Sequence, residues 1–399
     1  MPIDFTISEE QQLLKETASE FSKKYIEPAV EKMVKTHRLP SDLINAMARQ
    51  GFLGMTVPQE FGGMGADAVS TAIVAEEIAK FDTTASVSVL FLVDNAWSFL
   101  LSRYASRELK EEIMPRIAKG EIITGIASTE PNYGSDIGSM TTIAQKRGSH
   151  YEIRGEKSYI SLVRDIRERG GGYVTVSKTD AGKGTGGVTL FYVPDSPDIE
   201  ISDLEEMGRE GSSWGTLRFN GINVPENNVL GQVNGGFKII HEGFEFARGL
   251  ISVICAAAAE RAISRSVEYM KARKAFGKEI GKFEGLQFTL AEHVARIEAA
   301  KTVGYKALWM YDEEHKNRRF SRFQVTEEIA IAKLLSTTWA FEAINDALQF
   351  HGAYGYLKNN PLDLALRAIR SFQLAEGSRE VMKLIIAREA LGRDFFRGD

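Results

Sequence analysis

The chain has 399 residues, of which 43% are hydrophobic and 26% are charged, and this length predicts two or three domains with sizeable cores. The 49 basic and 54 acidic residues give a net charge of −5, which excludes a basic footprint for nucleic acid in the whole-chain balance. The most apolar stretch, residues 250–259, is shorter than the roughly 20 residues that a bilayer helix needs, so we expect no membrane insertion.

The N-terminal sequence and the cysteine content predict a cytoplasmic protein. The first residues include acidic side chains and lack the basic flank and apolar stretch of a signal peptide. The single cysteine, Cys255, rules out an internal disulfide and suggests a reducing compartment. Because small residues surround it in the sequence, we expect a buried small side chain and not a nucleophile.

Residues 1–122 are predicted to form a helical domain. Ser8 and Gln11 have the spacing of a capping box, which marks the start of a helix. Hydrophobic residues then recur at helical spacing. Further helices are expected at residues 43–49, 72–80, 86–104 and 109–118.

Within residues 123–233 the hydrophobic period changes to two, which indicates a β domain. Strands are predicted at residues 122–126, 150–154, 173–177, 188–193 and 216–224. Because turns rich in Gly, Asp and Asn separate them and no crossover helices are expected, we predict an antiparallel sheet or barrel.

Residues 234–399 are predicted to be mostly helical, since only one of the ten prolines, Pro361, lies beyond residue 225. Long helices are expected at residues 236–269, 285–312, 326–350 and 378–391. Their short connections favour an up-and-down four-helix bundle. The predicted fold class is therefore α+β and mainly α, with a helical domain, a β domain and a helical bundle in that order.

Two short motifs lack the context that their chemistry requires. Residues 182–187 satisfy G-x-G-x-x-G, but a strand follows where a dinucleotide site needs a helix, so a hairpin loop is predicted. Residues 211–215 satisfy G-x-S-x-G, but again a strand follows where a nucleophile elbow needs a helix. The six histidines are scattered and form no recognisable ligand pair, so no metal site is predicted.

Residues 129–136, with the sequence T-E-P-N-Y-G-S-D, are difficult to explain as packing. They leave a strand, turn at Pro131 and Gly134, and present hydroxyl and backbone N–H groups together. Such a turn can hold the edge of a heterocycle or a phosphate, and an ordinary loop is an equal alternative on this segment alone.

This segment resembles the T-E-P-x-x-G-S-D signature of the acyl-CoA dehydrogenase family, and five more segments resemble motifs of that family in the same order. They are residues 155–161, 220–227, 273–278, 349–356 and 375–378. The resemblance covers nearly the whole chain. It implies FAD as cofactor, an acyl-CoA substrate, an electron-transfer flavoprotein as the electron acceptor, and a homotetramer built as a dimer of dimers.

The resemblance also implies a catalytic base, Glu376, which removes the α-proton of the thioester while the β-hydride goes to flavin N5. A carboxylate can do this if water is excluded and the developing enolate is stabilised. Some family members place the base just before the arginine that matches Arg248, but Ala247 stands there in this chain. The alternative for Glu376 is a helix-terminal glutamate favoured only by the helix dipole.

Binding residues follow from the same resemblance. For FAD they are Ile126, Ser128, Thr129, Gly134, Ser135, Tyr159, Ile160, Ser161, Arg273, Phe276, Phe283, Gln349, Phe350, Gly352, Ala353, Ser378 and Glu380. For the thioester they are Ser135, Phe244, Glu245, Arg248 and Gly377. The family holds the adenosine end of FAD across a subunit interface, which implies an obligate oligomer.

Several positions depart from the family pattern, and three of them concern residues near the predicted FAD and thioester contacts. Glu284 replaces a common glutamine, Ala353 replaces the second glycine of its loop, and Ala375 replaces a frequent tyrosine beside the base. The change at Ala375 predicts a wider cavity for a branched, cyclic or long acyl group. Alternatives to a dehydrogenase are an oxidase that uses oxygen directly, a monooxygenase of the same fold, and a non-catalytic binding relative.

Overall fold

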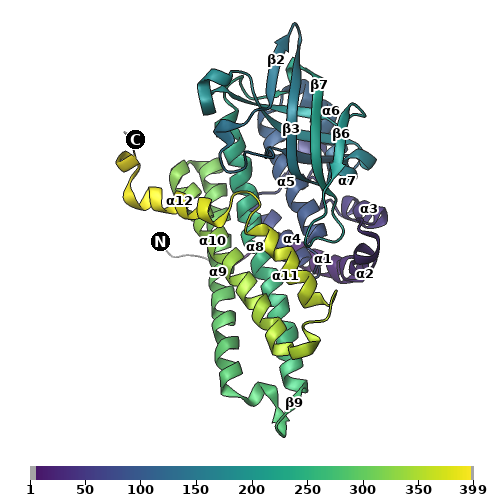
Figure 1. Cartoon of the computed structure of the whole chain (residues 1–399), viewed down its shortest axis with the longest axis vertical. Coiled ribbons are helices and arrows are strands. Elements are labelled where there is room, and N and C mark those ends of the chain that lie inside the picture. The colour runs from purple at the N-terminus through teal and green to yellow at the C-terminus, as the bar shows by residue number, and fades with distance from the viewer. Residues whose placement is uncertain (1–5, 397–399) are drawn as a thin grey trace.

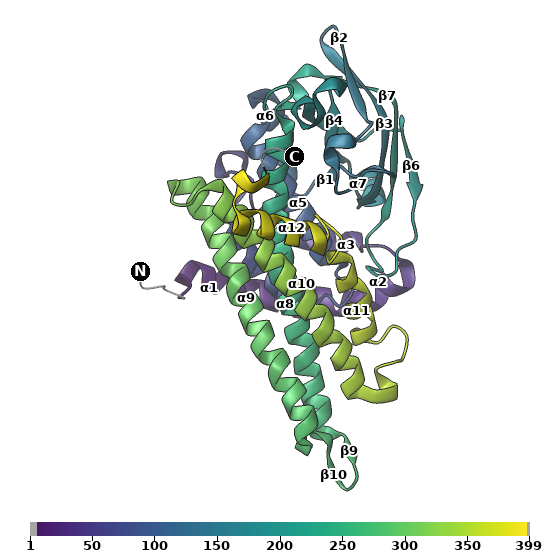
Figure 2. The same cartoon turned by 60° about the vertical axis from the view of Figure 1, so that its left-hand side comes forward.

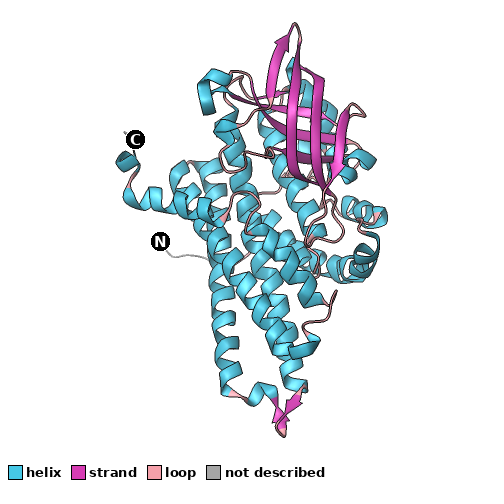
Figure 3. Cartoon of the chain, viewed as in Figure 1, coloured by secondary structure: helices cyan, strands magenta, loops and turns pink. Residues whose placement is uncertain are grey.

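The computed structural model describes residues 6–396. Residues 1–5 and 397–399, at the outer ends of the predicted first and last domains, lie outside the described residues. Helices come first, then a sheet, then long helices (Figures 1 and 3), which confirms the predicted fold class. The exact domain boundaries stay predictions.

The first helices enclose much of the N-terminal core. They are α1 (Glu9–Phe21), α2 (Glu27–Thr36), α3 (Ser41–Arg49), α4 (Ala68–Ala79), α5 (Ser86–Tyr104) and α6 (Arg107–Ala118), with a π-helical turn at Ser22–Ile26. The capping box is confirmed, because Ser8 and Gln11 bond reciprocally at the start of α1. Helix α2 was not predicted; Met33 is its single buried residue, and Pro28 lies in its first turn.

The sheet is mostly antiparallel. Its strands are β1 (Ile123–Ala127), β2 (Ile143–Arg147), β3 (His150–Ser161), β4 (Gly171–Lys178), β5 (Val188–Pro194), β6 (Ile199–Asp203), β7 (Trp214–Pro225) and β8 (Val229–Leu230). They follow the order β6-β7-β3-β2-β4-β5-β8, with β1 beside β4. The strands β2 and β6 were not predicted; each has only five residues, and most of these are exposed.

A wholly antiparallel sheet was expected, and this is wrong at two pairs. Strand β1 runs parallel to β4, and β2 meets β4 in parallel at Ile143 and Lys178. Strands β1, β2 and β4 run in the same direction because the segment that joins β1 to β2 does not reverse the chain. Helix α7 (Val163–Arg169), which was not predicted, returns the chain between β3 and β4. The predicted hairpin loop at residues 182–187 is confirmed, because it joins the antiparallel strands β4 and β5.

The C-terminal helices form a bundle. They are α8 (Gly236–Ala272), α9 (Glu284–Asn317), α10 (Arg322–His351), α11 (Pro361–Phe372) and α12 (Arg379–Leu391), and a small hairpin of β9 (Lys274–Ala275) and β10 (Lys278–Glu279) joins α8 to α9. Figure 2 shows α11 beside the long helices and α12 lying across them. The fourth bundle helix is therefore the unpredicted α11. Pro361 suggested a break, but it occupies the first turn of α11, where a missing N–H costs nothing.

Cys255 lies on α8 and is completely buried, as predicted. Within residues 6–396, no helix has both the length and the apolar character that a membrane crossing requires.

Candidate active site

Glu376 lies in the turn between α11 and α12. The side chain of Ser378 caps α12 by accepting the N–H of Val381. Glu376 has φ 55° and Gly377 has φ 103°, so two successive residues have left-handed backbone. This conformation costs a residue with a side chain about 1–2 kcal/mol, and it persists only where the surrounding structure holds it.

The Glu376 carboxyl group has an unusual environment. The residue is half-buried, but its Oε2 atom is shielded from solvent and has no hydrogen-bond partner. Burial raises the pKa of this carboxyl, while the positive charges of Arg248 and Lys333 act in the opposite direction. A carboxyl with a raised pKa and an unused oxygen is suited to accepting a proton. A glutamate favoured only by a helix dipole would be exposed to solvent and would not have a shielded, unbonded carboxyl oxygen.

Two of the expected thioester contacts, Phe244 and Arg248, reach this turn from α8. Arg248 is buried, and its Nε donates to the backbone oxygen of Glu376 at 2.6 Å. The guanidinium of Arg248 lies 5.6 Å from the centre of the Phe244 ring. The structure thus brings Phe244, Arg248, Glu376 and Gly377 together.

Glu245, the third expected contact on α8, faces a different set of residues. Its carboxylate lies 2.5 Å from Nη2 of Arg322 and accepts a hydrogen bond from Thr326 Oγ1 at 2.6 Å. Burial raises the pKa of Glu245, and Arg322 opposes that shift. Both partners stand at the start of α10, so Glu245 joins α8 to α10. Its expected role as a thioester contact stays a prediction.

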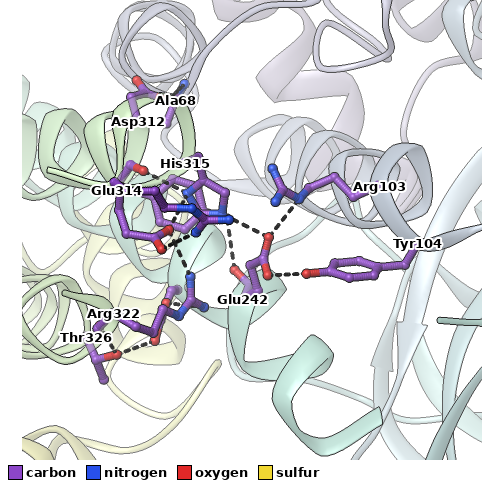
Figure 4. Close-up of polar contacts among 12 residues, drawn as sticks. Ala68, Arg103, Tyr104, Glu242, Asp312, Glu314, His315, Arg322 and Thr326 are labelled. Atoms are coloured by element: carbon purple, nitrogen blue, oxygen red, sulfur yellow. Dashed lines mark hydrogen bonds and ion pairs between the residues drawn. The ribbon is translucent and has the colours of Figure 1, made fainter. Parts of the chain in front are cut away.

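A buried polar cluster adjoins these residues (Figure 4). Glu242 of α8 accepts from Tyr104 at 2.5 Å, and its carboxylate lies 2.9 Å from both Arg103 and His315. Burial acts to raise the pKa of Glu242, but the bonds from His315 and Tyr104 lower it to about 2. Figure 4 shows Arg322 and Thr326 next to this group. The cluster ties α5, α8, α9 and α10 together at the N-terminal end of α8.

The segment after β1 is anchored to β3. Lys157 Nζ donates to the backbone oxygen of Ser128 and to Glu130, each at 2.9 Å, and the Ser158 N–H donates to Thr129. Burial acts to raise the pKa of Glu130, but the charge of Lys157 lowers it to about 2. Glu130 and Lys157 therefore fix the backbone around Ser128 and Thr129. Beside them, residues 130–133 line a cavity of about 190 Å³.

Tyr159 and Ser161 end β3 at an irregular point of the sheet. The pairing with β7 shifts register after Lys157, and Tyr159 has φ 63°. The Tyr159 ring is half exposed and lies 5.4 Å from the ring of Trp214. Ser161 accepts from Arg209 at 3.2 Å. A strained, exposed aromatic residue is typical of a binding surface.

A second group of predicted FAD contacts lies at the opposite end of the bundle. The cavity there has a volume of about 330 Å³, and its lining includes Arg273, Gln349, Phe350, Gly352 and Ala353. In Figure 1 the β9 hairpin marks this end, far from the sheet. A single chain therefore does not bring the two groups together.

The other predicted FAD contacts lie close to one group or the other. Phe276 is 96% exposed in the hairpin and packs edge-on against Phe283. Glu380 lies exposed in the first turn of α12, beside the Glu376 turn. Ile126 lies on β1 and Ile160 on β3, while Gly134 and Ser135 continue the turn after Glu130.

Sequence reasoning missed Lys333 and Arg209. Lys333 is fully buried on α10 and donates to the backbone oxygen of Ala375 at 2.5 Å and to that of Gly377. Its signal was a lysine at a core-facing position among Ala332, Ser336 and other buried residues. Arg209 belongs to no motif, so nothing in the sequence marked it.

Three family models match consecutive parts of the chain. Residues 8–121 match the N-terminal domain of acyl-CoA dehydrogenase, residues 125–222 its middle domain, and residues 234–391 its C-terminal domain. Together they span most of the chain.

Individual proteins agree with these matches. An acyl-CoA dehydrogenase of Bacillus subtilis is 32% identical over 97% of this chain and 99% of its own. A chain from a structural study of the electron transferring flavoprotein of Acidaminococcus fermentans is 30% identical and has a TM-score of 0.90. The match covers 98% of this chain and 100% of that one. The structure of PigA with FAD and proline is 26% identical with a TM-score of 0.91, over 98% of this chain and 100% of PigA. The chain therefore belongs to the acyl-CoA dehydrogenase family of flavoprotein oxidoreductases.

Proposed function

We propose that the chain oxidises an acyl-CoA thioester to the 2-enoyl-CoA, with FAD as cofactor and Glu376 as the base. Family membership supports the reaction class. The observation that carries the assignment of the base is the buried Oε2 atom of Glu376, which has no hydrogen-bond partner. Glu210 and Glu245 also have such an oxygen, but their carboxylates pair with Arg367 and Arg322, and no such pair holds the Glu376 carboxyl within residues 6–396. Such an oxygen is available to a proton from a bound ligand.

The residues present fit FAD. The exposed ring of Tyr159 beside Trp214 offers an aromatic face, and the anchored Ser128–Thr129 backbone and the Ser161 hydroxyl offer polar contacts to a flavin. At the other end of the bundle, Arg273 offers a cation beside a cavity large enough for part of a nucleotide. Because one chain separates the two groups, we infer that a second copy supplies the adenosine contacts.

In the proposed reaction the Cα–H bond breaks and its proton moves to the Glu376 carboxylate, while the electron pair left behind forms the double bond to Cβ. FAD, when bound, is the two-electron oxidant that takes the hydrogen leaving Cβ together with its bonding electrons. Burial raises the pKa of the Glu376 carboxyl and so makes the carboxylate more basic, while the charges of Arg248 and Lys333 favour the ionised form.

The wider physiological setting belongs to the same proposal. An electron-transfer flavoprotein would reoxidise the cofactor, a part that the likeness to the Acidaminococcus fermentans structure supports. The homotetramer and the cytoplasmic location rest on the family resemblance and on the single cysteine. Ala375 in place of a bulkier residue favours a branched, cyclic or long acyl group, and a strict preference for butyryl-CoA would count against this.

Anaerobic bleaching of the flavin by a panel of acyl-CoA thioesters tests the proposal. The wild-type protein should bleach with at least one thioester, and Glu376→Gln should slow bleaching by about 10²–10⁴-fold, the usual contribution of a general base. FAD absorbance and thioester binding should persist in the variant. Glu389→Gln is the matched control, because this partly buried carboxylate pairs with Arg393 at the far end of α12, and it should bleach at the wild-type rate. An undiminished rate in Glu376→Gln would remove Glu376 as the base, and oxygen uptake without an added acceptor would favour an oxidase.

A further inference from the structure

Two buried cations from two different helices hold the turn that carries Glu376. Lys333 of α10 donates to the backbone oxygen of Ala375 at 2.5 Å and also to that of Gly377. Arg248 of α8 donates to the oxygen between them, that of Glu376 itself, at 2.6 Å. Three consecutive carbonyl groups are therefore bound by charged donors.

We propose that Lys333 is a positioning residue for Glu376. Its ammonium group fixes the backbone on both sides of the glutamate, and its charge favours the ionised, proton-accepting form of the carboxyl. This inference rests on the proposed role of Glu376 as the base, and it adds a residue that the family motifs do not contain.

The geometry of the turn explains why such a clamp is needed. Glu376 and Gly377 both have positive φ, a conformation that needs support from outside the turn. One bonded carbonyl would leave the turn free to swing about that contact, whereas bonds on both sides of Glu376 fix its two ends. Thr337, one helical turn after Lys333, accepts from Gln373 at 3.1 Å through its backbone oxygen. The same helix thus anchors the chain before the turn and within it.

Few ionisable groups surround the ammonium group of Lys333. The groups that act on it are Arg248 and Cys255 from α8 and Glu376 from the turn. Burial and the neighbouring Arg248 lower the pKa of Lys333 to about 7, and Glu376 opposes this. A buried ammonium group is costly, and an apolar side chain of similar size would avoid that cost in a helix core. Retaining the lysine is therefore better explained by its action on Glu376 than by packing.

Lys333→Met tests the inference in the FAD-loaded protein. A misplaced catalytic group can lower a rate by about 10²-fold, so anaerobic flavin bleaching should slow by about that factor while the acyl-CoA affinity is kept. Losing the positive charge of Lys333 disfavours the ionised form of Glu376. The acid limb of the pH profile of the bleaching rate should therefore move to higher pH. Lys333→Arg restores the charge and should return the acid limb to its wild-type position, whatever its absolute rate.

Lys80→Met is the matched control, because Lys80 is a shielded lysine paired with Glu76 and Glu77 at the end of α4. It should lower the unfolding midpoint and leave the acid limb in place. The inference is overturned if Lys333→Met keeps both the wild-type rate and the wild-type acid limb. If that variant does not fold with FAD, Lys333→Gln replaces it in the test, because glutamine keeps N–H donors and removes the charge. A shift of the acid limb in the pH profile of Lys333→Gln supports the inference, and an unshifted acid limb overturns it.

These outcomes are distinct from failure of the proposed function. If Glu376→Gln keeps the wild-type rate, the base is elsewhere, and the proposed function and this inference fail together. If Glu376→Gln slows flavin bleaching but Lys333→Met keeps the wild-type rate and acid limb, Glu376 remains the proposed base and only the proposed role of Lys333 fails.

Discussion

Two glutamates near the bundle core, Glu245 and Glu376, differ in what surrounds their carboxyl groups. Each has an Oε2 atom without a hydrogen-bond partner. The Glu245 carboxylate nevertheless pairs with Arg322 and accepts from Thr326, whereas no ion pair or hydrogen bond holds the Glu376 carboxyl within residues 6–396. Both have a pKa raised by burial, so the pKa direction alone does not separate their roles. The bonding partners do differ, and they favour a structural role for Glu245 and the proposed chemical role for Glu376.

Glu245→Gln should therefore reduce stability more than activity. The substitution removes the nearer of the two carboxylates that pair with the partly buried Arg322, which should lower the free energy of unfolding by about 1–3 kcal/mol. Urea unfolding measures this loss, and flavin bleaching by acyl-CoA should stay within about tenfold of wild type, well above the effect expected for a lost catalytic base. Unchanged stability with a weakened thioester affinity would instead support the role that the family resemblance implies for Glu245.

A second carboxylate, Glu130, makes stability depend on acid pH. Its folded pKa of about 2 lies below the ordinary value of 4.5, so the stability that it contributes is present above about pH 4.5 and is lost as the pH falls towards 2. Glu130→Gln should remove about 1–3 kcal/mol of unfolding free energy at neutral pH. The difference between wild type and variant should shrink as the pH falls through that window, as measured by unfolding at several pH values. A difference that is constant with pH would contradict this origin.

At the scale of elements, the link between α11 and α12 decides where the proposed base points. Gly377 has φ 103°, and an added Cβ would lie 3.0 Å from Met382 and 3.3 Å from Nη2 of Arg248. Gly377→Ala should therefore displace the turn and slow flavin bleaching by about 10²-fold. Ser371→Ala, at the end of α11, is a control that should bleach at the wild-type rate. A wild-type rate in Gly377→Ala would show that the turn tolerates the strain.

Most elements of the fold could be predicted because their signals are local. The capping box at Ser8 and the long apolar periodicities of α5, α8 and α10 each lie within one segment of sequence. The parallel pairing of β1 with β4 could not be predicted, since it depends on how distant strands dock around α7. Helix α11 was missed because a proline in a first turn looks the same in sequence as a proline that breaks a helix.

The candidate site divides in the same way. Glu376, Arg248 and Phe244 were found through family motifs, and the structure places them together. Lys333 bonds to the turn that carries Glu376, and Arg209 bonds to Ser161 on the sheet, but none of the six matched segments includes either residue. Their roles depend on tertiary contacts to Ala375, Gly377 and Ser161, which sequence spacing does not reveal.

For the whole molecule, the separation of the two groups of FAD contacts predicts complementation between inactive copies. Glu376→Gln should be slow, and Arg273→Ala should bind FAD weakly. In a mixed dimer, one site combines an intact Glu376 from one copy with an intact Arg273 from the other. Unfolding and refolding the two variants together with FAD should therefore recover bleaching activity. If the mixture is no more active than the separate variants, each chain holds its FAD alone.

The seclusion of Cys255 on α8 has a practical consequence. Because the sole native thiol is completely buried, maleimide reagents should react with a cysteine introduced on the surface and spare the native one. If the proposed oligomer forms, a fluorophore pair attached at the tip of the β9–β10 hairpin would then report the spacing between its protomers through energy transfer. Such distance measurements can therefore be made in the wild-type sequence, without first replacing Cys255.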